Sequence, residues 1–311
     1  MKKIISVLLL LASLTVCLFG CGKPDTTVAK IGVMSGPTGM GMAKLMNDND
    51  EENPKYDFTV YSNPTTATTD LMAENLDMLC LPTNTAAMLA NKNPDKITVL
   101  AINTLGSLYL VTDANTAIKS FADLEGKTIY ASVPNSTTGP IINYLLEKNN
   151  VNAEIVFEAD HDALVAKVVK NEVSIAVLPE PKVSAALFKN SAYSVDLNLS
   201  SEWDKVSDTP LTMGCIVVRN EFLTEHKSLI KEFLKNYKAS IEYVVDEKNT
   251  DAVDMIINEE IIPAGAPVVK SALNNLRKSI VYLDGEDMKA ALLDFYAAIN
   301  ISAPSDQFFY D

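Results

Sequence analysis

The sequence is poor in the residues that bind metals and carry redox chemistry. Its 311 residues include four cysteines and two histidines, with no Cys-x-x-Cys pair and no Cys/His cluster. This excludes zinc and dithiol motifs, so we expect neither a metal nor a cofactor. Cys80 and Cys215 lie in apolar, strand-like runs. We expect two buried free thiols there, with one disulfide as the alternative.

Residues suited to catalysis are also scarce. His161 and His226 each begin a predicted helix beside acidic residues, where we expect surface positions, and no Gly-x-Ser-x-Gly motif is present. We therefore expect no enzymatic activity. Glu180 differs because it follows an apolar strand and lies between two prolines. It either points into a cleft or simply begins a helix.

Positive charge is in short supply. The chain has 26 Lys and Arg against 40 Asp and Glu, a net charge of −14, which repels nucleic acid. Only two arginines occur, Arg219 and Arg277. Neither lies in a predicted ligand turn, so an anionic ligand would depend on helix N-termini and on Ser and Thr hydroxyls.

The Gly-rich stretch from Gly36 to Gly41 has the spacing of a nucleotide-binding loop without its chemistry. A phosphate loop continues with Lys and Ser or Thr, whereas this chain has Met42 and Ala43. Lys44 stands where a dinucleotide fingerprint needs its third glycine. We interpret this turn as one that lets a ligand approach the backbone without binding nucleotide.

The N-terminus is expected to be a targeting segment outside the fold. Two lysines precede an apolar run over residues 4–19, too short to span a bilayer comfortably, which ends at Gly20-Cys21. This arrangement resembles a bacterial lipoprotein signal. The resemblance implies a signal peptide at 1–20, lipid such as palmitate on Cys21, and a tether over 21–27. We expect an extracytoplasmic protein anchored to the cell membrane by that lipid.

Strand and helix patterns alternate along most of the chain, which predicts an α/β fold with mostly parallel sheets. The predicted strands are 28–34, 57–62, 78–81, 97–103, 108–112, 128–132, 154–158, 174–178, 194–197 and 213–219. The predicted helices between them are 40–47, 68–76, 85–91, 138–149, 162–170 and 183–188. After residue 219 the pattern is almost wholly helical, with segments at 229–244, 250–260, 266–276 and 286–299.

Polar turns follow three of these strands, at 35–39, 82–84 and 132–139. Ligands of open α/β sheets lie beyond the carboxyl ends of strands, where such turns collect. Each turn alone is consistent with a capped helix start, and Thr83 or Asn84 is placed to cap the helix that follows. Three of them, spread over two strand-helix series, favour a ligand cleft.

Three segments resemble the type II periplasmic solute-binding proteins, in the branch that binds sulfonate, nitrate and thiamine precursors. They are "DMLCLPTNTAAML" at 77–89, "DLEGKTIYAS" at 123–132 and "IAVLPEPKVSAAL" at 175–187. The resemblance implies two α/β domains joined by two crossover strands. Domain I would comprise 28–108 and 214–311, and domain II would comprise 109–213.

The resemblance also implies the ligand-binding residues: Ser35, Gly36, Pro37, Thr38, Gly39, Thr83, Asn84, Thr104, Ser107, Asn135, Ser136, Thr137, Thr138, Glu180 and Met213. The implied function is that of a monomeric, lipid-anchored solute-binding protein, which delivers a small organic molecule to an ABC transporter permease. The alternatives are a sensory relative, or an enzyme-like relative such as a dehydratase or a pyrimidine synthase. The pyrimidine synthases' Cys-rich iron motif is missing here. An anionic ligand and a planar heterocycle stacked on Tyr109, Tyr130 or Trp203 both remain open.

Overall fold

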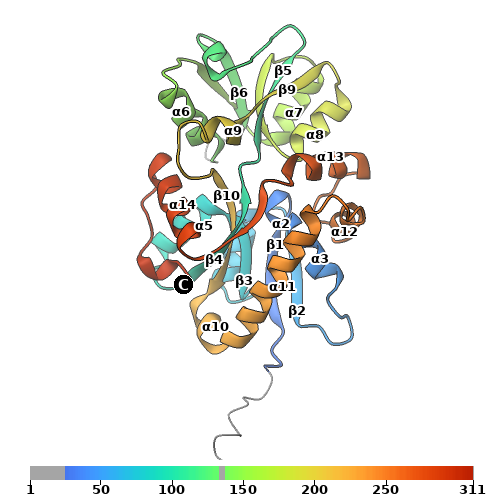
Figure 1. The fold of residues 1–311 in the computed structure, drawn as a ribbon, viewed down its shortest axis with the longest axis vertical. Coiled ribbons are helices and arrows are strands. Elements are labelled where there is room, and N and C mark those ends of the chain that lie inside the picture. Colours follow the sequence, from blue (N-terminus) through green and yellow to red (C-terminus); the bar gives the residue numbers. More distant parts are fainter. Residues whose placement is uncertain (1–24, 133–136, 311) are drawn as a thin grey trace, which may run out of the picture.

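The computed structural model describes residues 25–132 and 137–310 as two sheets flanked by helices (Figure 1). The predicted signal peptide, Cys21 and the first part of the tether lie outside the described residues. Within the described ranges, no helix combines the length and the apolar character needed to cross a membrane.

The first sheet, sheet A, contains six strands in the order β11-β4-β10-β3-β1-β2. Strands β1, β2 and β3 pair in parallel, whereas β10 is antiparallel to β3 and β4, and β11 is antiparallel to β4. The bounds are β1 Ala29–Met34, β2 Tyr56–Tyr61, β3 Met78–Pro82, β4 Ile97–Leu105, β10 Thr212–Arg219 and β11 Ile280–Leu283.

The second sheet, sheet B, contains five strands in the order β7-β6-β8-β5-β9. Strand β6 is parallel to β7 and β8, whereas β5 is antiparallel to β8 and β9. The bounds are β5 Leu108–Asp113, β6 Thr128–Ser132, β7 Glu154–Glu158, β8 Ile175–Pro179 and β9 Tyr193–Asn198.

The expected α/β class is confirmed, and the pairing is more mixed than expected for mostly parallel sheets. The chain passes from β4 of sheet A into β5 of sheet B, and returns through residues 199–211 into β10 of sheet A. Strands β5 and β10 therefore start at the edge where their neighbours end, so they run against those neighbours. The two crossings thus account for the reversed strands β5 and β10.

Helices cover the faces of both sheets and mostly fall where the hydrophobic period predicts them. In the longest, α11, the buried positions Leu229, Phe233 and Tyr237 recur at steps of four and form one apolar face. The helix bounds are α2 Pro37–Met40, α3 Ala43–Asn47, α4 Pro64–Met72, α5 Thr83–Lys92, α6 Thr138–Lys148, α7 His161–Val169, α8 Lys182–Lys189, α9 Leu199–Trp203, α10 Asn220–Glu225, α11 Lys227–Val245, α12 Ala252–Asn258, α13 Ala266–Leu276 and α14 Gly285–Ala298. Short 3-10 turns occupy Phe121–Leu124 and Asp306–Phe308.

Three predicted elements need correction. The single helix expected at 40–47 is split into α2 and α3, with Gly41 and Met42 between them. The C-terminal part is not wholly helical, because β11 pairs with β4 at the edge of sheet A. Trp203, expected in a turn, ends the short helix α9.

One continuous core connects the two halves of the molecule. Trp203 is fully buried, with its ring 4.6 Å from the Tyr144 ring on α6 and 5.9 Å from the Phe295 ring on α14. The expectation for the cysteines is confirmed, since Cys80 and Cys215 are buried and free. Burial raises the pKa of Cys80 to about 12 and also raises the pKa of Cys215, so both remain thiols.

Candidate functional site

The candidate site lies where one edge of sheet A faces one edge of sheet B (Figure 1). Strands β3 and β4 end at that edge of sheet A, and β10 begins there. Strands β6 and β8 end at the facing edge of sheet B, where β5 begins. Because only Gly106 and Ser107 separate β4 from β5, the two edges are held close together.

The sheet A edge gathers several predicted site residues. Gly214 pairs with Pro82 on one side and with Thr104 on the other. A Cβ atom at Gly214 would lie 2.8 Å from the Thr38 hydroxyl, so α2 packs directly against this edge. The Thr83 hydroxyl donates to the Thr212 carbonyl at 3.1 Å. Four separate segments of the chain therefore converge here.

The expected capping role at the start of α5 is wrong. Pro82 is the N-cap, without a side-chain capping bond, and Thr83 bonds across to β10 instead. Asn84 is half-buried, and its carboxamide oxygen is 3.5 Å from the Thr85 hydroxyl. Met213 is also half-buried and packs against the core. Within the described residues, neither side chain hydrogen-bonds to another predicted site residue.

Two buried polar atoms at the sheet A edge have no hydrogen-bond partner within the described residues: Asn103 Nδ2 and Thr212 Oγ1. Asn103 is 1% exposed and Thr212 is fully buried. Leaving such a group unpaired costs about 1–3 kcal/mol. The Asn103 side chain faces the Tyr237 hydroxyl and the Cys80 thiol in the core. Thr212 Oγ1, on the first residue of β10, is therefore the atom of this edge that a ligand or an ordered water can pair with.

The turn before α2 is built differently from the prediction. Gly36 has φ of 107°, which favours glycine, and its N–H donates to the Ile261 carbonyl at 2.9 Å. The Ser35 hydroxyl donates to the same carbonyl at 2.9 Å. At Gly39 a Cβ atom would lie 2.3 Å from the Met34 carbonyl oxygen. Gly39 is therefore required for packing against β1 rather than for ligand approach.

Thr38 remains the member of that turn best placed to reach a ligand. It is half-buried beside Pro37, and its hydroxyl makes no hydrogen bond within the described residues. The N–H groups of Ser35, Gly36 and Gly39 all donate to carbonyls within the protein. These three N–H groups are therefore already engaged within the protein. Of this turn, Thr38 remains the candidate for ligand contact.

The sheet B edge carries the other predicted residues. The Glu180 N–H donates to the Ser107 carbonyl at 3.0 Å, which joins the end of β8 to the start of β5. Thr137 is the N-cap of α6 and Thr138 its first residue, and both are buried. Asn135 and Ser136 lie outside the described residues.

Glu180 combines features of both interpretations. It is 1% exposed, and its Oε2 accepts the Ser184 N–H at 3.1 Å, as expected of a helix-start carboxylate. Its Oε1 accepts the Asn275 amide at 2.6 Å, which belongs to α13 and not to its own helix. Burial raises the pKa of Glu180, although these hydrogen bonds oppose the shift.

His161 was expected on the surface, and the structure corrects this. Its Nδ1 lies 2.5 Å from the Ser132 hydroxyl at the end of β6, on the site edge of sheet B. Burial, followed by the nearby Lys182, lowers the pKa of His161, which favours the neutral imidazole. The missed signal is its position, because His161 begins a helix directly after a strand, like the other site turns.

The aromatic side chains considered for stacking on a ligand make other contacts within the protein. Trp203 is enclosed in the core, and the Tyr109 hydroxyl donates to the Asn275 carbonyl at 3.0 Å. Tyr130 lines a pocket at the outer end of sheet B. These positions do not support the planar heterocycle alternative.

The two arginines also bind away from the site. Arg219 ends β10 and pairs with Asp77 at 2.9 Å, at the opposite end of sheet A. Arg277 donates to the Val244 carbonyl. Neither guanidinium contacts a predicted site residue in the described structure.

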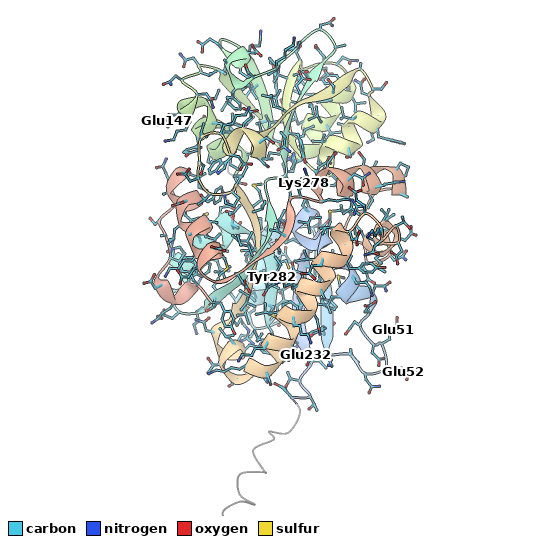
Figure 2. All side chains as sticks on the ribbon, in the orientation of Figure 1. Glu51, Glu52, Glu147, Glu232, Lys278 and Tyr282 are labelled. Atoms are coloured by element: carbon cyan, nitrogen blue, oxygen red, sulfur yellow. The ribbon has the colours of Figure 1, made fainter. Side chains whose placement is uncertain are left out.

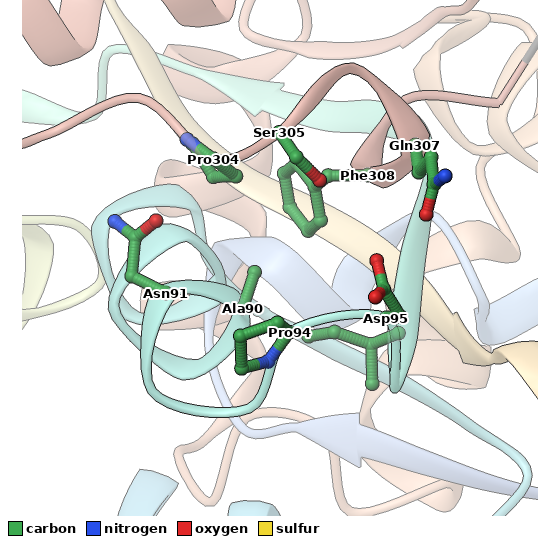
Figure 3. A pocket seen from close by; sticks show the side chains of 9 residues that line it. Ala90, Asn91, Pro94, Asp95, Pro304, Ser305, Gln307 and Phe308 are labelled. Carbon is green, nitrogen blue, oxygen red and sulfur yellow. The ribbon is translucent and has the colours of Figure 1, made fainter.

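Two surface pockets lie at the outer ends of the sheets. The first, of about 180 Å³, lies between the end of α5 and residues 304–308 (Figure 3). It reaches Ile97, the first residue of β4, whereas the candidate site lies at the other end of that strand. The second, of about 380 Å³, borders Thr128 at the start of β6. No group of three or more potential metal ligands occurs among the described residues.

Comparison with known proteins identifies a family. Residues 53–264, more than half of the chain, match the family described as "ABC transporter, phosphonate, periplasmic substrate-binding protein". No curated protein matches the chain significantly. The members of this family are binding proteins of transporters.

Solved structures share the fold over almost the full chain. An ABC transporter protein from Parabacteroides distasonis is 22% identical with a TM-score of 0.75, covering 92% of this chain and 99% of its own. The ligand-binding component of an ABC-type import system from Staphylococcus aureus, solved with zinc bound, is 15% identical with a TM-score of 0.72, covering 91% and 96%. The periplasmic aliphatic sulphonate binding protein from Escherichia coli is also 15% identical with a TM-score of 0.72, covering 91% and 92%.

At these sequence identities the structural matches establish the fold. The match to the family model establishes the protein family. Together they confirm the resemblance inferred from the sequence. The chain belongs to the periplasmic substrate-binding proteins of ABC transporters, in the family described for phosphonate.

Proposed function

We propose that this chain is a lipid-anchored solute-binding protein that captures a small organic anion between the facing edges of its two sheets. It then delivers the anion to an ABC importer. Membership of the transporter family supports the delivery role. The two sheets belong to two domains, with domain I at 28–108 and 214–311 and domain II at 109–213. The ligand lies between these domains.

The observation that carries this proposal is the unpartnered Thr212 hydroxyl at the sheet A edge. Thr212 Oγ1 can donate and accept, and it is buried without a partner in the described residues. Pairing this hydroxyl with a polar ligand removes an energetic cost that the ligand-free protein bears. Thr38 adds a second hydroxyl close to the same edge.

The ligand class follows from the family and from the donors available. The family is described for phosphonate, and one structural relative binds aliphatic sulphonate. Hydroxyl groups and the N-terminal N–H groups of α6 suit a tetrahedral oxyanion. A neutral His161 adds one ring N–H donor at the sheet B edge.

Native mass spectrometry of the purified protein tests the proposal, because binding proteins retain tight ligands. A thermal-shift series with alkylphosphonates and alkylsulfonates is the second measurement. Ligand at a hundred times its Kd should add about 2.7 kcal/mol to the free energy of unfolding. Recovery of the ligand unchanged separates binding from turnover.

Thr38→Val should weaken binding, because it removes one hydroxyl while keeping the shape of the side chain. The loss of one hydrogen bond to a ligand, about 0.5–1.5 kcal/mol, raises Kd roughly two- to twelvefold. Thr59→Val on the exposed outer face of β2 is the matched control and should bind normally. Equal affinities for the two variants would remove Thr38 from the site.

A further inference from the structure

Two pairs of polar residues face each other between α8 and α13, and they connect the two halves of the molecule. Glu180 and Ser184 belong to the sheet B half, and Ser271 and Asn275 belong to α13. Each pair is spaced four residues apart, which places its members on the same side of their segment. In Figure 1, α13 lies directly beneath α8. We call these four residues the α8–α13 clasp.

The clasp is a connected hydrogen-bond network. Glu180 Oε1 accepts the Asn275 amide at 2.6 Å and the Ser184 hydroxyl at 3.0 Å. The Ser184 and Ser271 hydroxyls are 3.0 Å apart. The Asn275 carbonyl accepts the Tyr109 hydroxyl at 3.0 Å. Asn275 therefore contacts the sheet B half through both its side chain and its backbone.

Helix α13 is fixed to the sheet A half on its other side. Val269, Leu273 and Leu276 are buried in the core beneath sheet A, whereas Ser271 and Asn275 point away from that core and are largely exposed. The clasp therefore adds a second connection between the two halves, beside the core around Trp203 that they share. Its bonds form only when the two edges are close together.

We propose that Asn275 is a positioning residue that sets ligand affinity by stabilising the closed arrangement of the two sheets, without contacting the ligand itself. This inference rests on the proposed function, because it assigns Asn275 a role in ligand capture. Glu180 is 1% exposed and has no solvent to replace the Asn275 amide. Opening the molecule exposes its carboxylate to water, and closing it requires Asn275 to supply the lost hydrogen bond.

Loss of the Asn275 hydrogen bond lowers the fraction of molecules in the closed state. Apparent affinity falls with the fraction of molecules in the binding-competent state, so weakening the closed state weakens binding. A hydrogen bond to a charged group is among the stronger ones, and its loss should reduce affinity on the order of tenfold. Asn275→Asp should have a larger effect, because a second carboxylate would face Glu180.

The test measures opening and binding separately. Small-angle X-ray scattering of the ligand-free protein gives the radius of gyration of the wild type and of Asn275→Ala, Asn275→Asp and Asn274→Ala. Asn274 is the matched control, because its side chain accepts from Arg277 within the same segment. Methylphosphonate titration by calorimetry then gives Kd, and urea unfolding confirms that each variant folds.

We expect the radius of gyration and Kd to increase in the order Asn274→Ala, Asn275→Ala and Asn275→Asp, with the first equal to wild type. Unchanged scattering in both Asn275 variants would overturn the clasp, whatever their affinity. If the Asn275 variants expand but the wild type binds neither phosphonate nor any retained ligand, the clasp stands and the proposed function fails.

Discussion

Two ionisable side chains at the sheet B edge are shifted towards their neutral forms. Burial raises the pKa of Glu180 and lowers the pKa of His161. Each shift reflects the cost of placing a charge where water is scarce. Both shifts therefore disfavour a fixed charge on these two side chains at the proposed site.

His161 makes stability depend on pH in a defined direction. Its ordinary pKa is 6.5 and its folded pKa is lower, so the unfolded chain binds more protons between the two values. The free energy of unfolding should therefore fall as the pH drops below about 6.5. His161→Gln removes this titration and should flatten the curve between about pH 7.5 and 5.

Urea unfolding at several pH values provides the measurement. Thr59→Val, which keeps both histidines and lies on the exposed face of β2, is the control and should retain the wild-type slope. Parallel curves for wild type and His161→Gln would contradict the assignment of a partly buried His161 with a lowered pKa.

At the scale of single residues, the sequence indicated which side chains are unusual better than it indicated which residues they contact. Arg219 and Arg277 lie outside the predicted turns in the sequence, and in the structure their contacts are also away from those turns. The position of His161 was missed because burial of a helix-start histidine depends on the strand end against which it packs, here Ser132. Glu180 was recognised as unusual, but its partner lies 95 residues away, beyond any local pattern.

At the scale of elements, the turn into α2 is shaped by packing. Gly39 allows α2 to approach β1, because a Cβ atom there would lie 2.3 Å from the Met34 carbonyl oxygen and 2.8 Å from Val33 Cγ1. Gly39→Ala should lower the free energy of unfolding by about 1–3 kcal/mol, as overpacking typically does.

Gly265→Ala is the control for this prediction. It precedes α13, and its added Cβ atom would come no nearer than 3.8 Å to Pro267 Cδ. Urea denaturation should show the loss at Gly39 and little change at Gly265. A stable Gly39→Ala protein that fails to bind ligand would restore the original interpretation of Gly39 as a ligand-approach residue.

Elements with a clear hydrophobic period were predicted almost to the residue, including β6, β7 and α13. Strand β11 was missed because its four residues are too few to establish a period of two, and because its pairing with β4 is tertiary. The split between α2 and α3 was missed because Met residues at helical spacing concealed the break at Gly41 and Met42.

At the scale of the whole molecule, the first described residues lie in the sheet A half, at the end remote from sheet B (Figure 1). The Asp25 carboxylate lies 2.8 Å from the His226 ring at the start of α11. Acidic side chains such as Glu51, Glu52 and Glu147 project from the surface (Figure 2), so nonspecific binding to anionic lipid is disfavoured. We therefore expect membrane attachment to depend on the lipid proposed for Cys21.

Cys21→Ser should move the protein from the detergent phase to the aqueous phase after phase partition, because the lipid has no other attachment point. Cys17→Ser is the matched control and should remain in the detergent phase. Mass spectrometry of the mature chain identifies the processed end. A detergent-phase Cys21→Ser protein without its signal peptide would contradict the anchor.

Trp203 is the only tryptophan of the chain, and its position makes the protein its own optical reporter. Its indole lies between a tilted ring on α6 beside sheet B and a tilted ring on α14 beside sheet A, and its Nε1 donates to the Thr209 carbonyl at 2.8 Å. Excitation at the long-wavelength side of the protein absorption band therefore selects this one buried indole over the tyrosines. Its emission depends on contacts with both halves of the molecule. A relative displacement of the halves alters quenching of that single indole, so ligand-driven motion becomes visible in unlabelled protein.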